Sequence, residues 1–178
     1  TLARGVIFIG CHPMAGREFS GFAYSQADLY KGASVIFTPV GEIPEEKKKT
    51  VEQLMLELKF GRIVYTTPEK HDQTIAFTSQ LAHVVSSAYI KSPTVKEESG
   101  FSAGSFRDLT RVARLNEDMW TELFLMNRPA LLYEIDTIMA ALAEYRDALA
   151  DGDAERMRSL LRDGRILKEW SLQHSITE

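Results

Sequence analysis

Residues 6–16 read Val6-Ile7-Phe8-Ile9-Gly10-Cys11-His12-Pro13-Met14-Ala15-Gly16. A run of branched and aromatic residues that closes on glycine is typical of a buried strand, so we expect a strand over residues 6–9. His12 then falls just beyond the carboxyl end of that strand, which is where open α/β sheets bind their ligands. The stretch therefore predicts an α/β fold with an imidazole at its ligand-binding edge.

The segment that follows repeats the strand pattern twice. Residues 34–38 and 62–67 are rich in branched and aromatic side chains and are predicted strands, and residues 43–60 between them carry apolar residues at helical spacing. Gly61 stands where a helix C-cap is expected. Strand–helix–strand is the pattern of a βαβ layer, so residues 1–68 are predicted to form an α/β unit.

Beyond Pro68 the pattern predicts helices and no further strand. A loop is expected over residues 92–105, and helices are expected over residues 69–91, 106–114, 116–128, 129–150 and 153–174. Residues 135–145 are apolar or small nearly all round the helix, which implies burial on several sides. A second copy of the chain would bury this helix, and so would a central place in a helical bundle. We predict homodimerisation through residues 69–178 and leave the bundle as the alternative.

Composition excludes several classes of function. The 178 residues carry a net charge of −4, which argues against a nucleic-acid or anionic-membrane partner, and no apolar run reaches ~18 residues, the length of a membrane span. The single cysteine, Cys11, cannot form an internal disulfide and fits a reducing cytoplasm. Neither a His-x-x-x-His pair nor a cysteine pair occurs, so we predict no metal site.

Two other stretches could carry chemistry. Ser79 and His83 lie four residues apart and share one face of the helix predicted over residues 69–91, which His71 and Asp72 open. Residues 102–111 run from a loop of small residues into a helix, whose free N–H groups suit an anion, and Arg111 one turn later is a natural partner of a carboxylate. Spacing alone also allows ordinary structural roles: a satisfied histidine, and a surface ion pair between Asp108 and Arg111.

As a set, these stretches resemble the prephenate/arogenate dehydrogenase family of tyrosine biosynthesis. The motifs occur in family order over most of the chain: His12-Pro13-Met14-Ala15-Gly16 with Glu18 behind it, Val35-Ile36-Phe37-Thr38-Pro39, His71-Asp72, Ser79-Gln80-Leu81-Ala82-His83, and Gly104-Ser105-Phe106-Arg107-Asp108-Leu109-Thr110-Arg111. Two departures are Gln80, where many relatives have a second histidine, and Ala103-Gly104-Ser105, which is usually richer in glycine.

The resemblance implies a fold and a reaction. The fold is an α/β remnant of a Rossmann-type domain in residues 1–68, followed by an all-α substrate-binding and dimerisation domain in residues 69–178. The reaction is the oxidative decarboxylation of prephenate to 4-hydroxyphenylpyruvate, or of arogenate, with NAD or NADP as hydride acceptor. His12 would accept the proton of the ring hydroxyl, and the implied substrate-binding residues are Arg111, His83, Ser79, Gly104 and Glu18.

The sequence lacks the motif with which the family binds its nicotinamide cofactor. In the family, the Gly-x-Gly-x-x-Gly turn belongs to the amino-terminal nucleotide-binding domain, and no such turn occurs in the 178 residues. We therefore expect only the carboxyl-terminal part of that domain here, assign no cofactor-binding residue, and expect no dehydrogenase activity from this chain alone. The alternative is a non-catalytic dimerisation module that senses an aromatic acid. His12 favours the enzyme, because a sensor needs the arginine but no proton acceptor.

Overall fold

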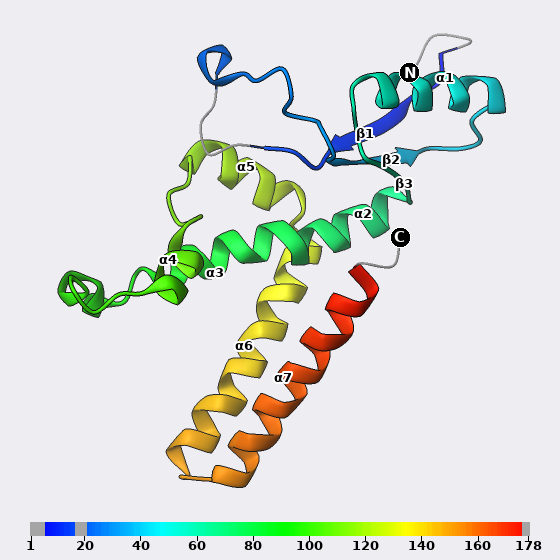
Figure 1. Cartoon of the computed structure of the whole chain (residues 1–178). Coiled ribbons are helices and arrows are strands. Elements are labelled where there is room, and N and C mark those ends of the chain that lie inside the picture. The colour runs from blue at the N-terminus through cyan, green and yellow to red at the C-terminus, as the bar shows by residue number, and fades with distance from the viewer. Residues whose placement is uncertain (1–5, 17–20, 176–178) are drawn as a thin grey trace. The chain divides into compact units, whose positions relative to one another are not determined.

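A computed structural model describes residues 6–16 and 21–175 (Figure 1). The chain divides into two compact units, Thr1–Leu131 and Leu132–Glu178. His12, Ser79, His83, Gly104 and Arg111 all belong to the first unit. Glu18, the remaining predicted site residue, lies outside the described residues. The domain boundary at residue 68 stays a prediction.

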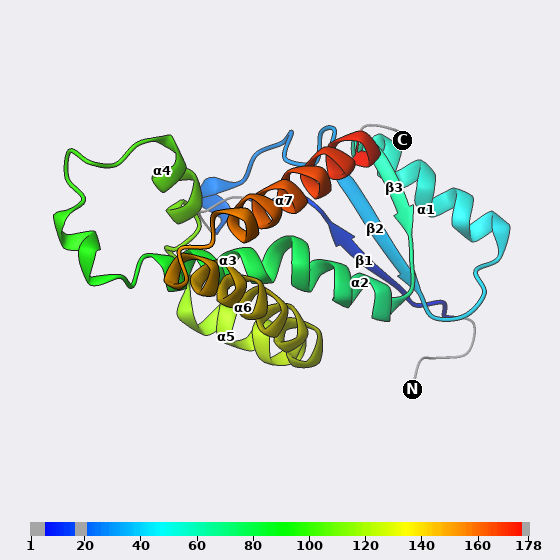
Figure 2. The same cartoon turned by 90° about the horizontal axis from the view of Figure 1, so that it is seen from below.

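The first unit begins with a three-stranded sheet in the order β1-β2-β3, made of β1 (Ile9–Pro13), β2 (Ser34–Pro39) and β3 (Arg62–Tyr65). β2 and β3 are parallel and are joined by helix α1 (Glu45–Glu57), whereas β1 pairs with β2 in the antiparallel sense (Figure 2). The predicted strand–helix–strand unit is confirmed.

The expected place of His12 beyond a strand end is wrong. β1 starts at Ile9, not Val6, and runs through His12 to Pro13. Ile9 pairs with Pro39, the last residue of β2, so residues 6–8 lie past the end of the strand they would need as a partner. Because β1 is antiparallel, its carboxyl end at Pro13 lies beside Val35, near the start of β2. The edge rule for parallel strands therefore does not apply to His12.

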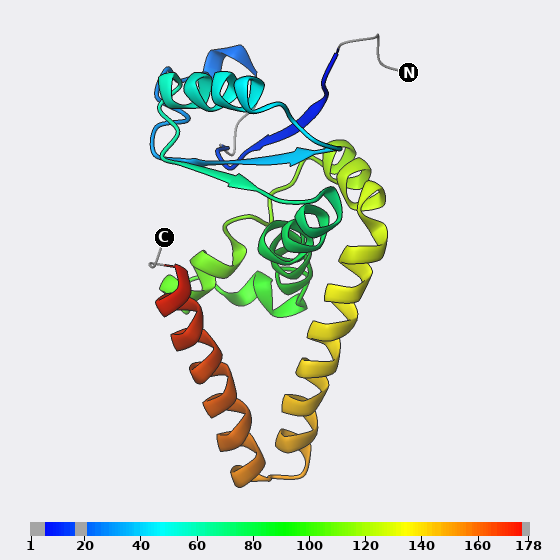
Figure 3. The same cartoon turned by 90° about the vertical axis from the view of Figure 1, so that its right-hand side faces the viewer.

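The hydrophobic core lies on one face of this sheet. Val35 and Phe37 of β2 are buried against Met55 of α1 and Phe60, so α1 covers that face. Successive residues of a strand point to opposite faces, and His12 pairs with Ile36, so His12 faces away from the core. Helix α2 (Pro68–Ile75) packs against β2, and Figure 3 shows α1 and α2 on opposite faces of the sheet.

Gly61 is not the C-cap of α1. The helix ends at Glu57 with Leu58 as its cap, and Lys59 takes the left-handed conformation with φ of 67°. Gly61 is needed for another reason: a Cβ at this position would lie 2.8 Å from the carbonyl oxygen of Gly32. The absence of a side chain lets the two backbones approach each other at the start of β3.

After β3 the described residues form helices and no further strand, as predicted. The helix expected over residues 69–91 is divided: α2 is followed by a π-helical turn, Ala76–Gln80, and by α3 (Leu81–Tyr89). A short 3-10 turn (Pro93–Glu97) precedes α4 (Gly104–Thr110) and α5 (Glu117–Met126). Asn116 caps α5, because its Oδ1 accepts the N–H of Met119 at 2.9 Å.

The second unit is a helical hairpin made of most of α6 (Arg128–Ala150) and of α7 (Ala154–Ser175). The two helices diverge from the turn that joins them (Figure 3). Near that turn, the hydroxyl of Tyr145 donates to the carbonyl of Leu160 at 3.1 Å. Much apolar surface stays exposed, at Tyr133, Met139, Leu142, Leu149, Leu161, Leu167 and Trp170. Within the described residues, no helix is long and apolar enough to cross a membrane.

Candidate functional site

His12 is in direct contact with a second histidine. Its Nδ1 lies 2.8 Å from Nε2 of His71, which α2 brings to the same face of the sheet. The two rings meet edge to face, with centroids 5.1 Å apart. On its other side, Nδ1 of His71 lies 2.9 Å from Oδ1 of Asp72. The three side chains form a hydrogen-bonded row, of which the sequence predicted a role only for His12.

The surroundings of His12 suit a proton acceptor. Partial burial, and after it the electrostatic effect of the neighbouring His71, lower the pKa of His12 below its ordinary value of 6.5. A lowered pKa keeps the imidazole unprotonated at neutral pH, which is the form that accepts a proton. The place of His12 on β1, in contact with His71 of α2, also restricts the orientation of its ring.

Ser79 and His83 meet as predicted, although through the backbone. Nδ1 of His83 lies 2.9 Å from the carbonyl oxygen of Ser79, so the contact uses the Ser79 carbonyl and not its hydroxyl. The His83 ring stacks on the indole of Trp120 from α5, with centroids 3.9 Å apart. Ser79 belongs to the π-helical turn, a feature that often occurs at functional sites. Trp120 is thereby a site candidate that the sequence reasoning did not assign.

Gly104 and Arg111 mark the two ends of α4. Gly104 is the first residue of this helix, and Arg111 caps its end in a helical conformation. A Cβ added at Gly104 would meet no atom within 4 Å. The fold itself therefore does not require glycine at this position, in contrast to Gly61. The roles predicted for Gly104 and Arg111 in substrate binding stay predictions.

Two hydrogen-bonded amides, the buried Gln80 and the partly buried Asn127, connect the helices around this site, and the sequence gives no local signal for them. Gln80 is 6% exposed; its Nε2 donates to the carbonyl of Leu123 at 3.3 Å and its Oε1 accepts from Nδ2 of Asn127 at 2.9 Å. Nδ2 of Asn127 also donates to the backbone carbonyl of Asp72 at 2.8 Å. Gln80 thus joins the π-helical turn to the junction of α5 with α6, and Asn127 joins the same junction to α2.

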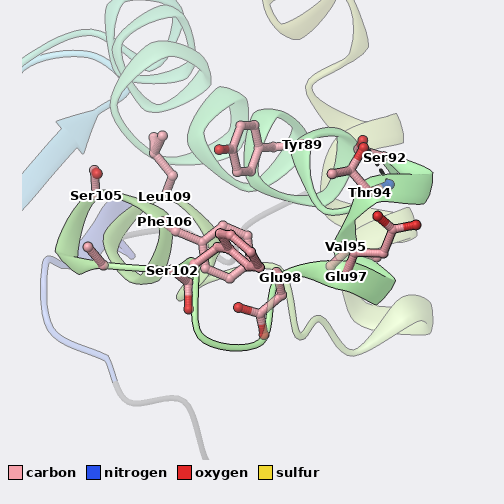
Figure 4. Close-up of a pocket in the computed structure, with 12 residues that line it drawn as sticks. Tyr89, Ser92, Thr94, Val95, Glu97, Glu98, Ser102, Ser105, Phe106 and Leu109 are labelled. Atoms are coloured by element: carbon pink, nitrogen blue, oxygen red, sulfur yellow. Dashed lines mark hydrogen bonds between the residues drawn. The ribbon is translucent and has the colours of Figure 1, made fainter.

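A pocket of about 760 Å³ lies elsewhere in the first unit, between the end of α3, the 3-10 turn and α4 (Figure 4). Its charged lining residues are the acids Glu97 and Glu98, and no Lys, Arg or His is among the described residues that line it. Oε2 of Glu98 is buried without a hydrogen-bond partner among the described residues. None of the five described site residues lines this pocket, and its acidic lining disfavours an anionic occupant.

Among the described residues, no group of three or more His, Cys, Asp or Glu side chains is arranged to hold a metal ion. The candidate site has three parts. They are the hydrogen-bonded row from His12 to Asp72, the pair of Ser79 and His83 beside Trp120, and the α4 segment that ends at Arg111.

Comparison with protein families matches nearly the whole chain to two models. Residues 1–65 match the nucleotide-binding domain of prephenate dehydrogenase, and residues 67–163 match the dimerization domain of prephenate dehydrogenase. The two matches meet at the end of β3, where the sheet gives way to helices.

Individual relatives agree with these matches. The chain is 35% identical over 155 residues to a cyclohexadienyl dehydrogenase of Zymomonas mobilis, and 33% identical over 160 residues to a prephenate dehydrogenase of Bacillus subtilis. Each alignment covers 84% of this chain, but only 53% and 42% of the respective relative. The chain thus spans about half the length of the curated relatives it matches.

Solved structures give the same result. Prephenate dehydrogenase from A. aeolicus, in complex with hydroxyphenyl propionate and NAD+, matches with a TM-score of 0.77 at 29% identity, over 91% of this chain and 58% of that one. An arogenate dehydrogenase of Synechocystis matches with a TM-score of 0.76 at 25% identity, over 92% of this chain and 61% of that one. The predicted fold class, an α/β remnant followed by a helical region, is confirmed.

Proposed function

We propose, from the fact that the chain belongs to the prephenate dehydrogenase family, that it is the substrate-binding and dimerisation part of an enzyme that oxidatively decarboxylates prephenate or arogenate. The observation that carries this proposal is the half-buried His12, held at 2.8 Å from His71 and with its pKa lowered. The relatives include cyclohexadienyl, prephenate and arogenate dehydrogenases, which supports a cyclohexadienyl acid as the substrate class.

The chemistry that this chain supplies is proton transfer and anion binding. The ring hydroxyl of the substrate loses its proton as hydride leaves the same carbon, and carbon dioxide then departs as the ring becomes aromatic. His12 accepts the hydroxyl proton, because an unprotonated imidazole near neutrality is an effective general base. A general base of this kind contributes typically ~10²–10⁴-fold to the rate.

Arg111 is the cation that we assign to the substrate carboxylate, since a guanidinium binds a carboxylate with two parallel hydrogen bonds. We assign further substrate contacts to Ser79, His83, Gly104 and Glu18. The acidic pocket beside α4 is a poor site for such a substrate, because Glu97 and Glu98 would repel its carboxylates.

The residues of this chain do not fit a complete nucleotide site. The described turns from a strand to a helix, after β2 and after β3, contain Pro44 and Pro68 and no Gly-x-Gly-x-x-Gly sequence. NAD or NADP supplies the hydride acceptor when bound, and we place its diphosphate contacts outside these 178 residues. We therefore propose that the chain alone turns over no substrate.

We further propose that the active form is a homodimer through the helical part, in the cytoplasm. The match of residues 67–163 to a dimerization domain and the exposed apolar side chains of α6 and α7 support the dimer. The aromatic-acid sensor stays the alternative.

The test is a chimera in which the amino-terminal part of the Zymomonas mobilis relative precedes residue 1 of this chain. Reduction of NAD or NADP is followed with prephenate or arogenate. We expect turnover from the chimera and none from the 178-residue chain. His12→Asn in the chimera lowers kcat by ~10²–10⁴-fold, which is the contribution of a general base.

The matched control is His174→Asn, which replaces an exposed histidine near the end of α7 and should leave kcat unchanged. Thermal unfolding of each variant shows that the fold is retained. A chimera that binds the substrate but never turns it over would support the sensor instead, and wild-type turnover by His12→Asn would remove the assigned base.

A further inference from the structure

The hydrogen bonds within the row formed by His12, His71 and Asp72 determine which nitrogen of each imidazole carries the proton. An ionised carboxylate only accepts hydrogen bonds, so the 2.9 Å contact between Oδ1 of Asp72 and Nδ1 of His71 places a proton on that nitrogen. A neutral His71 then carries its lone pair on Nε2. The 2.8 Å contact with Nδ1 of His12 consequently requires the proton of His12 to be on Nδ1.

We propose that His71 and Asp72 are positioning residues that hold His12 in the Nδ1–H tautomer, so that the proton-accepting lone pair lies on Nε2. The catalytic consequence rests on the proposed function, whereas the tautomer itself does not. Neither residue needs to touch the substrate in this arrangement. A carboxylate that orients an imidazole through its ring N–H is a recurrent way to keep a base in one tautomer.

The surrounding contacts keep this pair in place. Thr67 caps α2 by accepting the N–H of Lys70 at 3.2 Å, and it thereby fixes the first turn of the helix that carries His71. At the other end, Asn127 binds the backbone carbonyl of Asp72 at 2.8 Å. The side chain of His71 is 19% exposed, so solvent competes only weakly for its ring nitrogens.

The opposite direction is less favourable. If His12 carried its proton on Nε2, His71 would have to donate from Nε2, and a neutral His71 would then present a lone pair to the carboxylate of Asp72. Only a doubly protonated His71 would escape this conflict. The two possibilities differ in where the protons of both rings reside, and nitrogen NMR distinguishes them.

The experiment records long-range ¹H–¹⁵N spectra of the 178-residue chain with ¹⁵N-labelled histidine, at a pH where His12 is neutral. The variant His12→Gln identifies the His12 signals. We expect a protonated Nδ1 and an unprotonated Nε2 for His12. Asp72→Asn, whose amide can donate to His71, should shift His12 toward the Nε2–H form, and the control Asp136→Asn, at an exposed acid of α6, should not.

In the chimera, Asp72→Asn should lower kcat by ~10–100-fold, part of what a general base contributes, with little change in KM, and Asp72→Glu should restore part of the loss. A wild-type His12 with its proton on Nε2, or a tautomer that Asp72→Asn leaves unchanged, would overturn the proposal whatever the turnover. An inactive wild-type chimera with the expected tautomer would instead contradict the proposed function and leave the positioning pair standing.

Discussion

At the scale of single residues, Gln80 shows what one buried amide can require of a fold. Burying an amide costs free energy unless its donors and acceptor find partners, and Gln80 finds them at Leu123 and Asn127. Those partners are 43 and 47 residues away in the sequence. The side chain therefore contributes to the packing of α5 against the helix that carries the π-turn.

Replacement of this amide gives a stability prediction. Gln80→Met keeps the length of the side chain but removes its hydrogen bonds to the Leu123 carbonyl and to Nδ2 of Asn127, so we expect a loss of about 1–3 kcal/mol in the free energy of unfolding. Urea unfolding followed by circular dichroism measures it. The control Gln53→Met replaces an exposed glutamine of α1 and should stay within about 0.5 kcal/mol. A change in the free energy of unfolding for Gln80→Met that is as small as that of the control would show that Gln80 has no structural role.

Residues also differ in how well a sequence predicts them. His12, Ser79, His83 and Arg111 could be proposed as site residues because their motifs lie in short, ordered stretches. His71 was noted within a motif but received no role, and Gln80 was seen only as a departure from relatives. The contacts that define these two side chains join distant segments, and no local pattern reports such contacts.

At the scale of elements, hydrophobic periodicity predicted that a strand forms near residue 9, but it did not predict the register of β1. The apolar run from Val6 predicted a strand, and a strand forms, but its register follows from pairing with β2. The alternation of sides then places His12 toward α2, opposite the core around Phe37. The His12 imidazole therefore lies next to α2 because of its register in β1, and not because it follows the end of a strand.

The helix after Pro68 is a second element whose details hydrophobic periodicity did not predict. Apolar spacing predicted one long helix over residues 69–91, yet the N–H of Leu81 bonds the carbonyl of Ala76, five residues back, and creates a π-turn. One extra residue in a turn shifts the faces of α2 and α3 relative to each other. A shift of this kind depends on tertiary contacts such as those of Gln80, which hydrophobic periodicity does not contain.

At the scale of the whole molecule, the hairpin of α6 and α7 leaves large apolar side chains of both helices exposed. Leu142 on α6 is 59% exposed and Leu167 on α7 is 67% exposed. Full burial of a leucine side chain contributes about 1.5–3 kcal/mol, and in a two-fold symmetric dimer each residue contributes twice. The hairpin is therefore the surface on which we expect a second copy of the chain.

Sedimentation of the 178-residue chain tests this expectation. We expect a dimer for the wild-type chain and a monomer for the double variant Leu142→Glu, Leu167→Glu, because four buried carboxylates would oppose association. The control is Leu56→Glu, at an exposed leucine of α1, which should remain dimeric. A monomeric wild-type chain at micromolar concentration, or dissociation by the control alone, would contradict dimerisation through the hairpin.

The central claim is that His12 is the proton acceptor of a cyclohexadienyl dehydrogenase, and the pH dependence of kcat/KM in the chimera tests it most directly. Burial and His71 lower the pKa of His12, so the unprotonated base persists below the ordinary 6.5. We predict that kcat/KM is constant around neutral pH and falls on the acid side with an apparent pKa below 6.5. An acid limb above 6.5, or an unchanged profile in His12→Asn at the wild-type rate, would contradict the account.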